Sequence, residues 1–253
     1  FFNKTRRNVS ENPYATVILQ DPLTFETWRL HLRFLRAETE GPLFDTMSMR
    51  IQVIASHTGM AGVFRLLSAD VYEVLAYAPV EGFLMPPDPV LDAQAPPPVA
   101  GPMTELRSLQ LVSERISRSA DLDGLLAETL AALDECLGFS HSMVLLLDEC
   151  TGRLVTIASR GYGAKGFGAE VSVGQGVIGM AAEKRRIVRI AGMGAELRYG
   201  RAIRGRVAEL DEGAKLAPEI PLPGLADAQV QLALPLLSCQ RMVGVLAVES
   251  RDP

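Results

Sequence analysis

The sequence predicts an α+β protein of two domains. Runs with a period of two residues are typical of strands with one buried face, and runs with apolar residues three or four positions apart are typical of amphipathic helices. A third observation is a proline-rich segment in which neither period continues. At 253 residues, the chain is long enough for two domains with separate cores.

The proline-rich segment spans residues 79–102 and holds half of the 16 prolines. Proline lacks a backbone N–H donor and favours extended conformations, so this segment is expected to be a semi-rigid linker. The predicted domains are therefore residues 1–78 and residues 103–253.

Five elements are predicted before the linker, in the order helix, strand, strand, helix, strand. The second strand shows the clearest alternation, with apolar side chains at every other position from Trp28 to Phe34. The second helix begins at Gly41-Pro42, carries apolar residues at three- and four-residue spacings, and ends near Thr58-Gly59. The predicted ranges are 4–12, 15–19, 28–34, 42–58 and 63–76.

After the linker, the order of elements is typical of an antiparallel sheet flanked by helices. Asp121 is positioned to cap the second of two amphipathic helices. The predicted helices are 106–116, 121–137 and the short 177–183, and the predicted strands are 142–147, 154–160, 231–237 and 242–249. A long irregular stretch is expected from Ala191 to Ala228.

Composition excludes several classes of function. A net charge of -5 argues against a surface that binds nucleic acid, and no apolar run approaches the roughly 18 residues of a membrane helix. Three cysteines without a CxxC spacing predict neither a disulfide framework nor a zinc ribbon. We therefore expect a cytoplasmic protein. Because the chain starts with Phe1 and ends directly after a strand-like run, we interpret both ends as cut.

The first domain carries the runs FFNKTRRNVSENPYATVILQDP, WRLHLRFLRAETEGPLF and IASHTG. Over residues 1–78 it resembles the pyridoxamine 5'-phosphate oxidase-like split β-barrels, with the first strands of the barrel missing. The resemblance implies FMN as a cofactor, with its phosphate held by Lys4, Thr5, Arg6 and Arg7. Basic donors at the start of a helix suit a phosphate.

The alternative interpretation of these four residues is that they form the exposed, basic start of a helix and bind no phosphate. A flavin carries its own reactive ring, so no catalytic residues need to be assigned. His31 and His57 are the remaining candidates for chemistry, and a structural or surface role is the preferred interpretation of both.

The second domain carries the runs VSVGQGVIGMAAEKRRIV and QLALPLLSCQRMVGVLAVES. They resemble the glycine turn, short helix and terminal hairpin of GAF domains, a fold shared by many sensors of small molecules. The glycines from Gly174 to Gly179 also satisfy G-x-G-x-x-G. The strand and acidic residue that a dinucleotide site needs are missing from the surrounding sequence, so we interpret these glycines as serving a tight turn and close helix packing.

The GAF resemblance implies a ligand cavity between the sheet and a cover of helices and loops. The residues expected to line it are Phe139, Met143, Phe167, Val177 and Ile178, with side chains of the 191–228 stretch.

Within that stretch, Arg198, Arg201 and Arg204 recur every third position with Tyr199 between them. In a helix they form a cationic stripe that suits a carboxylate or phosphate. A solvated face balanced by nearby acidic residues is the preferred alternative. His141 and Cys150 flank a strand and are candidate ligands of iron or haem, but one imidazole without nearby partners is usually structural, and no metal site is predicted.

The sequence therefore predicts the sensory region of a signalling protein, in which a small molecule in the GAF cavity controls an attached output domain, with no catalytic residues of its own. A homodimer is expected, with the apolar stripe of 106–116 as an interface. Two alternatives remain open: an FMN-dependent oxidoreductase with an accessory GAF domain, and a dimerisation scaffold without a ligand.

Overall fold

The computed structural model describes residues 3–21, 26–81, 102–162, 168–210 and 216–252. By packing, the chain divides into unit 1, formed by Phe1–Met47 and Leu66–Val99, and unit 2, formed by Ser48–Arg65 and Ala100–Pro253. The sequence placed all of 1–78 in one domain. Ser48–Arg65 belongs instead with unit 2, because Val53 and Ile54 are buried in the core of that unit.

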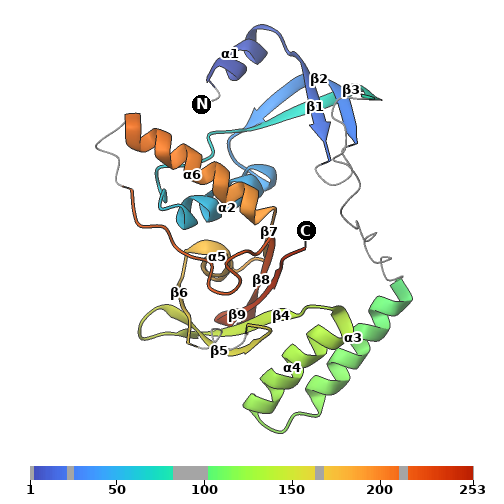
Figure 1. Cartoon of the computed structure of the whole chain (residues 1–253), viewed down its shortest axis with the longest axis vertical. Helices are drawn as coiled ribbons and strands as arrows, with labels where there is room; N and C mark the ends of the chain where they lie inside the picture. The colour runs from blue at the N-terminus through green and yellow to red at the C-terminus, as the bar shows by residue number, and fades with distance from the viewer. Residues whose placement is uncertain (1–2, 22–25, 82–101, 163–167, 211–215, 253) are drawn as a thin grey trace, which may run out of the picture. The chain divides into compact units, whose positions relative to one another are not determined.

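Unit 1 is built on a three-stranded antiparallel sheet in the order β1-β2-β3, preceded by helix α1 (Figure 1). The bounds are α1 Asn3–Glu11, β1 Tyr14–Gln20, β2 Thr27–Glu38 and β3 Ala69–Pro79. β3 begins later than the alternation from Val63 predicted, because Val63 and Phe64 lie in a turn where both donate to the Met60 carbonyl. The split barrel itself stays a prediction.

Unit 2 has a curled six-stranded antiparallel sheet in the order β6-β5-β4-β9-β8-β7. The four predicted strands are present, and the short strands β6 and β7 extend the sheet at its two edges. The bounds are β4 His141–Asp148, β5 Arg153–Arg160, β6 Glu170–Ser172, β7 Val188–Ala191, β8 Val230–Ser238 and β9 Arg241–Ser250.

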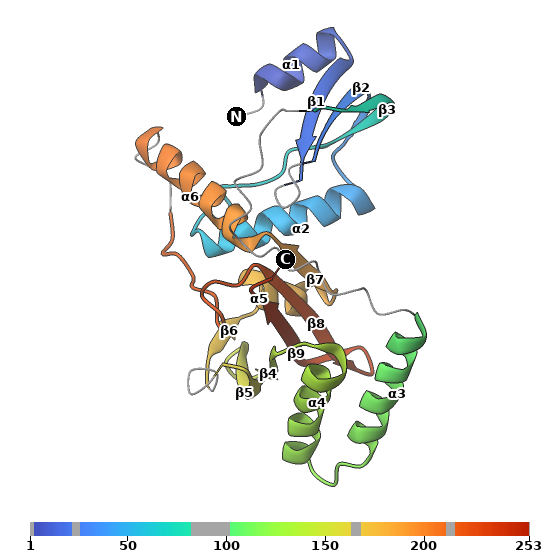
Figure 2. The ribbon, with the colours of Figure 1, turned by 45° about the vertical axis from the view of Figure 1, so that its right-hand side comes forward.

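Helices α3 (Pro102–Ser117) and α4 (Leu122–Leu137) lie side by side (Figure 2), and α4 packs on one face of this sheet. The predicted cap is confirmed, since the Asp121 carboxylate accepts a hydrogen bond from Gly124 N at 2.7 Å. From α4, Leu130 and Leu133 pack against Val144 of β4.

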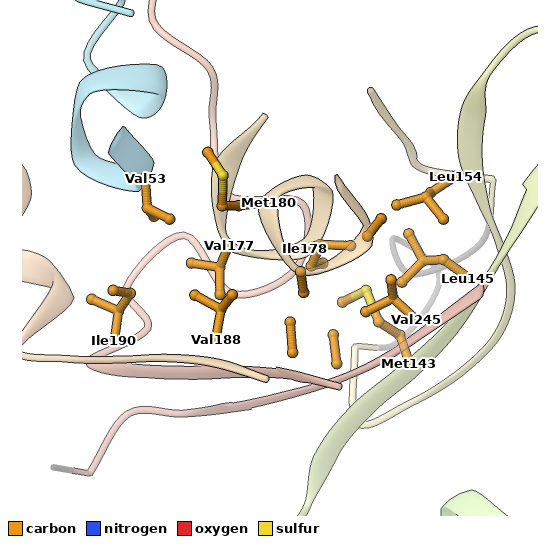
Figure 3. Close-up of a cluster of buried hydrophobic side chains, with 14 of the residues drawn as sticks. Val53, Met143, Leu145, Leu154, Val177, Ile178, Met180, Val188, Ile190 and Val245 are labelled. Carbon is orange, nitrogen blue, oxygen red and sulfur yellow. The ribbon is translucent and has the colours of Figure 1, made fainter. Parts of the chain in front are cut away.

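Helix α5 (Gly176–Lys184) and the C-terminal part of α2 (Pro42–His57) cover the opposite face. Figure 3 shows Val177 and Ile178 of α5 between Val53 of α2 and sheet residues such as Val245. Because side chains alternate along a strand, the two faces of β4 contribute to two different clusters.

Helix α6 (Met193–Leu210) corrects the expectation of an irregular stretch from Ala191 to Ala228. Gly192, with φ of 69°, lies between β7 and α6. The helix then buries Leu197 and Ile203 alongside the C-terminal part of α2 (Figures 1 and 2). Arginines lie between these apolar residues in the sequence, so the three- and four-residue spacing of a buried helix face was not recognised. None of the helices in the described part of the chain is long and apolar enough to span a bilayer.

Candidate ligand-binding site

A cavity of about 440 Å³ lies in unit 2 beside the N-terminus of α5. Its walls come from the end of α2, from strands β5 and β6, from the start of α5, from residues 220–223 and from β8. The residue before β6 also contributes. The lining residues are His57, Arg153, Ala169, Glu170, Val171, Ser172, Gln175, Gly176, Val177, Ile178, Ile220, Pro221, Leu222, Pro223 and Gln231. Its walls are mainly apolar with a few polar groups, as in most small-molecule sites.

His57, the last residue of α2, is 3% exposed and is among the lining residues of this cavity. Its Nδ1 lies 2.9 Å from the carbonyl oxygen of Ile220. A carbonyl only accepts, so Nδ1 carries a proton, and Nε2 presents a lone pair when the ring is neutral. Burial lowers the pKa of His57, which favours this neutral form. Nε2 has no hydrogen-bond partner in the described part of the chain.

The glycine turn before α5 makes room for this histidine. Gly176 has φ of 62°, and a Cβ on it would lie 2.9 Å from both Cε1 and Nε2 of His57. Its N–H donates to the Ser56 hydroxyl at 2.8 Å. Gly179 packs against the backbone, because a Cβ there would lie 2.1 Å from the Ser172 carbonyl oxygen. These contacts agree with the interpretation that the glycines serve a turn and close packing.

Gln231 of β8 lies within a buried polar network on the same face of the sheet. Its Nε2 donates to Glu249 Oε1 of β9 at 2.5 Å, while Glu249 Oε2 accepts from Leu225 N at 2.6 Å. Burial raises the pKa of Glu249. Within the described ranges, Gln231 Oε1 has no hydrogen-bond partner, and the residue is completely buried. A second unpaired acceptor therefore belongs to a residue of the cavity wall.

Residues 216–225, which we call the strap, form one wall and are fixed at several points. Ile220 N donates to the His57 carbonyl and Ala217 N donates to the Gly59 carbonyl, at 2.9 Å and 2.8 Å. Arg204 of α6 donates to the carbonyls of Thr58 and Ala217 at 2.6 Å and 2.7 Å. The strap is thus held by the 48–65 segment, by α6 and, through Leu225, by β9.

The rim of the cavity carries an ion pair. Arg153 Nη1 lies 2.5 Å from Glu170 Oε2, and the two side chains are 51% and 49% exposed. An exposed pair of this kind contributes little to stability, but it neutralises the charge of the arginine.

Val177 and Ile178, which were predicted to line a ligand cavity, are among the lining residues of this cavity, and their contact with a ligand stays a prediction. Met143 is buried in the core on the same face of the sheet, and Phe139 is 37% exposed in the turn before β4; neither is among the lining residues of this cavity. Phe167 lies outside the described residues.

The predicted cationic stripe lies on α6, away from the cavity lining. Arg198 and Tyr199 are exposed, Arg201 pairs with Glu219 at 3.0 Å, and Arg204 binds the strap. The stripe therefore supports the strap from outside, and its contribution to ligand binding stays a prediction.

The predicted flavin-phosphate residues lie on α1 in unit 1. Lys4, Arg6 and Arg7 are exposed, and the side chain of Thr5 is outside what the structure describes. FMN binding there stays a prediction. In the described ranges, no group of three or more His, Cys, Asp or Glu side chains is arranged to hold a metal.

The sequence alone did not place His57 or Gln231 at a ligand cavity, and the preferred interpretation of His57 was a structural or surface role. Gln231 could have been found, because it occupies an inward-facing position of a strand whose other inward residues, such as Ala233, are apolar. His57 carries no comparable signal, since only long-range packing brings the end of α2 to α5.

Comparison with known proteins identifies the fold of unit 2. Residues 119–253 match the family model of the GAF domain. Similar solved structures include GAF domains of phosphoenolpyruvate-protein phosphotransferases, from Acinetobacter at 19% identity (61% of this chain, 81% of that chain, TM-score 0.43) and from Coxiella burnetii at 21% identity (60% and 80%, TM-score 0.45). Another is the free methionine-R-sulfoxide reductase of Neisseria meningitidis in complex with its substrate, at 21% identity (60% and 77%, TM-score 0.45). No curated protein is significantly similar to this chain.

Proposed function

This chain belongs to the GAF domain family, and we propose that unit 2 binds a small molecule in the cavity beside α5 and acts as the regulatory input of a signalling protein. One observation carries the proposal: the cavity of about 440 Å³ is lined by two buried residues, His57 and Gln231, that each have an unpaired polar atom within the described ranges. Buried polar atoms in folded proteins nearly always have a partner, so these two are candidates for ligand contacts.

The connections of the cavity wall support a regulatory role. A ligand that contacts His57 touches a residue joined by two hydrogen bonds to Ile220 of the strap. Through the strap it acts on α6, which holds Ala217 through Arg204. Preferential binding to one arrangement of these elements shifts the population toward that arrangement, and an attached output domain would respond to the shift.

The test is to release and identify whatever the purified chain binds, by mass spectrometry after denaturation. The Ala169→Phe variant fills the cavity without removing a polar group, so it should lose the released molecule. Ala127→Phe is the matched control, because Ala127 lines a hollow of similar size, about 430 Å³, between α4 and β5.

The same measurement separates the alternatives. Retention of the molecule by Ala169→Phe, or its loss only from Ala127→Phe, would contradict the proposed site. Release of FMN with a flavin absorbance spectrum would favour the oxidoreductase, and a chain with no bound molecule and no response to added ligands would favour the scaffold.

A further inference from the structure

We propose that Glu249 of β9 is a proton-dependent latch for the strap. The neutral carboxyl holds Leu225, the last residue of the strap, against the sheet, and ionisation of the carboxyl releases Leu225 and opens the cavity wall at that end. The opposite end is held separately, by the hydrogen bonds between Ile220 and His57. The inference goes beyond the proposed function and needs no ligand, because movement of the strap is measurable in the chain alone.

The first step of the argument is the geometry of the contact. Glu249 is 2% exposed, and both of its carboxyl oxygens accept short hydrogen bonds. Oε2 accepts from Leu225 N at 2.6 Å, and Oε1 accepts from Gln231 Nε2 at 2.5 Å. Gly224 makes this close approach of the strap possible, because a Cβ there would collide with Glu249 Oε2. A single carboxyl therefore joins the end of the strap to β8 and β9.

The second step is that Glu249 forms no ion pair with a described residue. Arg251 of β9 pairs with Asp227 at 2.9 Å, and Nδ1 of His141, the cross-strand neighbour on β4, lies 3.0 Å from the Ser140 hydroxyl. The other titratable side chains on the elements around Glu249 are Tyr162, which follows β5, and the Glu183–Lys184 ion pair of α5. The buried carboxylate therefore has no cation to offset its charge.

The balance between burial and hydrogen bonding decides which form the closed latch prefers. Burial raises the pKa of Glu249, although its hydrogen bonds act in the opposite direction. A carboxyl that reaches water when the strap opens has its ordinary pKa, so the closed form binds the proton more readily than the open form. By linkage, closing takes up a proton and a rise in pH favours opening.

The third step is the partner of that proton. Gln231 Oε1 is buried and has no hydrogen-bond partner in the described ranges. A half-turn of the Gln231 amide exchanges Nε2 and Oε1, so the atom 2.5 Å from Glu249 becomes an acceptor for the carboxyl proton. The other carboxyl oxygen still accepts from Leu225 N. The neutral form thus keeps both hydrogen bonds without a buried charge, and Gln231 Nε2 becomes the unpaired atom.

Release at Leu225 affects the cavity, because the residues between the two ends of the strap line it. These residues are Pro221, Leu222 and Pro223. The two prolines have no N–H with which to fasten the backbone. Beyond Leu225, the next backbone bond to the sheet is that of Gln229 N to Ser250 O, at 2.8 Å. Opening of the latch therefore frees the wall between Ile220 and Gln229.

The experiment measures hydrogen exchange of the Leu225 and Ile220 amides in the full chain by NMR, from about pH 5 to about pH 8. Exchange is expressed as protection relative to a free peptide, which removes the intrinsic effect of pH. We expect the protection of Leu225 N–H to fall at least about tenfold as pH rises, the effect of one pKa unit of coupling. The protection of Ile220 N–H should not fall with it.

Glu249→Gln supplies a neutral side chain at every pH, with an oxygen for Leu225 N and an N–H donor for Gln231 Oε1. It should keep Leu225 protected over the whole range. Glu219→Gln is the matched control, because Glu219 is a strap carboxylate that is partly exposed and pairs with Arg201 at 3.0 Å. It should keep the pH dependence of the unmodified chain. The infrared band of a buried carboxylic acid should fade as Leu225 loses protection and should be missing from Glu249→Gln.

Protection of Leu225 that is constant with pH, that rises with pH, or that depends on pH equally in Glu249→Gln would each overturn the latch. If Glu249→Gln does not fold, the profiles of Leu225 and Ile220 in the unmodified chain still decide. A bound molecule that Ala169→Phe loses, in a chain whose strap shows no response to pH, would leave the proposed function standing while this inference fails. A strap that opens with pH in a chain that binds nothing would support the latch and not the ligand site.

Discussion

Replacing Gly176 with alanine should destabilise unit 2 by about 2–5 kcal/mol, from two sources. Its φ of 62° is in the left-handed region, where a side chain costs roughly 1–2 kcal/mol. The new methyl group would also lie 2.9 Å from the His57 ring. That ring is fixed by its bond to Ile220 O, so moving it loses a buried hydrogen bond, worth about 1–3 kcal/mol when a partner is left unsatisfied.

Gly152→Ala is the matched control. Gly152 has a similar φ of 67°, but a Cβ there meets nothing within 4 Å, so only the backbone cost of about 1–2 kcal/mol applies. Urea denaturation followed by far-ultraviolet circular dichroism measures both free energies of unfolding. In a His57→Asn background, the extra cost of Gly176→Ala should shrink. Equal costs for the two glycines in the unmodified chain would refute the argument that His57 packs against the glycine turn.

Three further predictions concern the dimer, pH and the flavin. Leu109→Glu should dissociate a homodimer, measured by light scattering, without lowering stability, because Leu109 is 57% exposed; Val112→Ala should lower stability, because Val112 is 9% exposed. Unchanged association in Leu109→Glu would exclude the α3 interface. The lowered pKa of His57 means that the unfolded chain binds this proton more readily, so stability should fall as pH drops below about 6.5, and less so in His57→Asn. A pH dependence identical in the two proteins would contradict the buried neutral histidine. Finally, Arg6→Ala with Arg7→Ala should reduce any flavin absorbance of the purified chain, and an unchanged spectrum would remove these residues from the FMN hypothesis.

The sequence predicted those elements whose signals are local. Helix α4 was found with its cap, because Asp121 and Gly138 are cap residues that act within one turn of the helix. Strands β4 and β8 are short, nearly continuous apolar runs, as expected for strands whose two faces both pack against helices. Helix α6 was missed, because its buried side chains are separated by arginines that bind the strap and its neighbours.

The residues of the candidate site also differ in whether the local sequence indicates their position. Val177 and Ile178 follow the glycine turn directly in sequence, so the local pattern placed both at the cavity. His57 and Gln231 are polar side chains whose importance depends on burial and on having an unpaired atom. The pattern of β8 indicates that Gln231 faces inward, but the burial of His57 and the unpaired atoms of both residues depend on long-range packing.

By itself, then, the sequence determined the type and order of most elements and the GAF character of the C-terminal part, since hydrophobic period, caps and glycine turns act over a few residues. Only the tertiary structure decided that the 48–65 segment completes unit 2 and that its last helical residue, His57, meets the start of α5. Contacts between residues more than a hundred positions apart arise from the packing of whole elements, which no local pattern encodes.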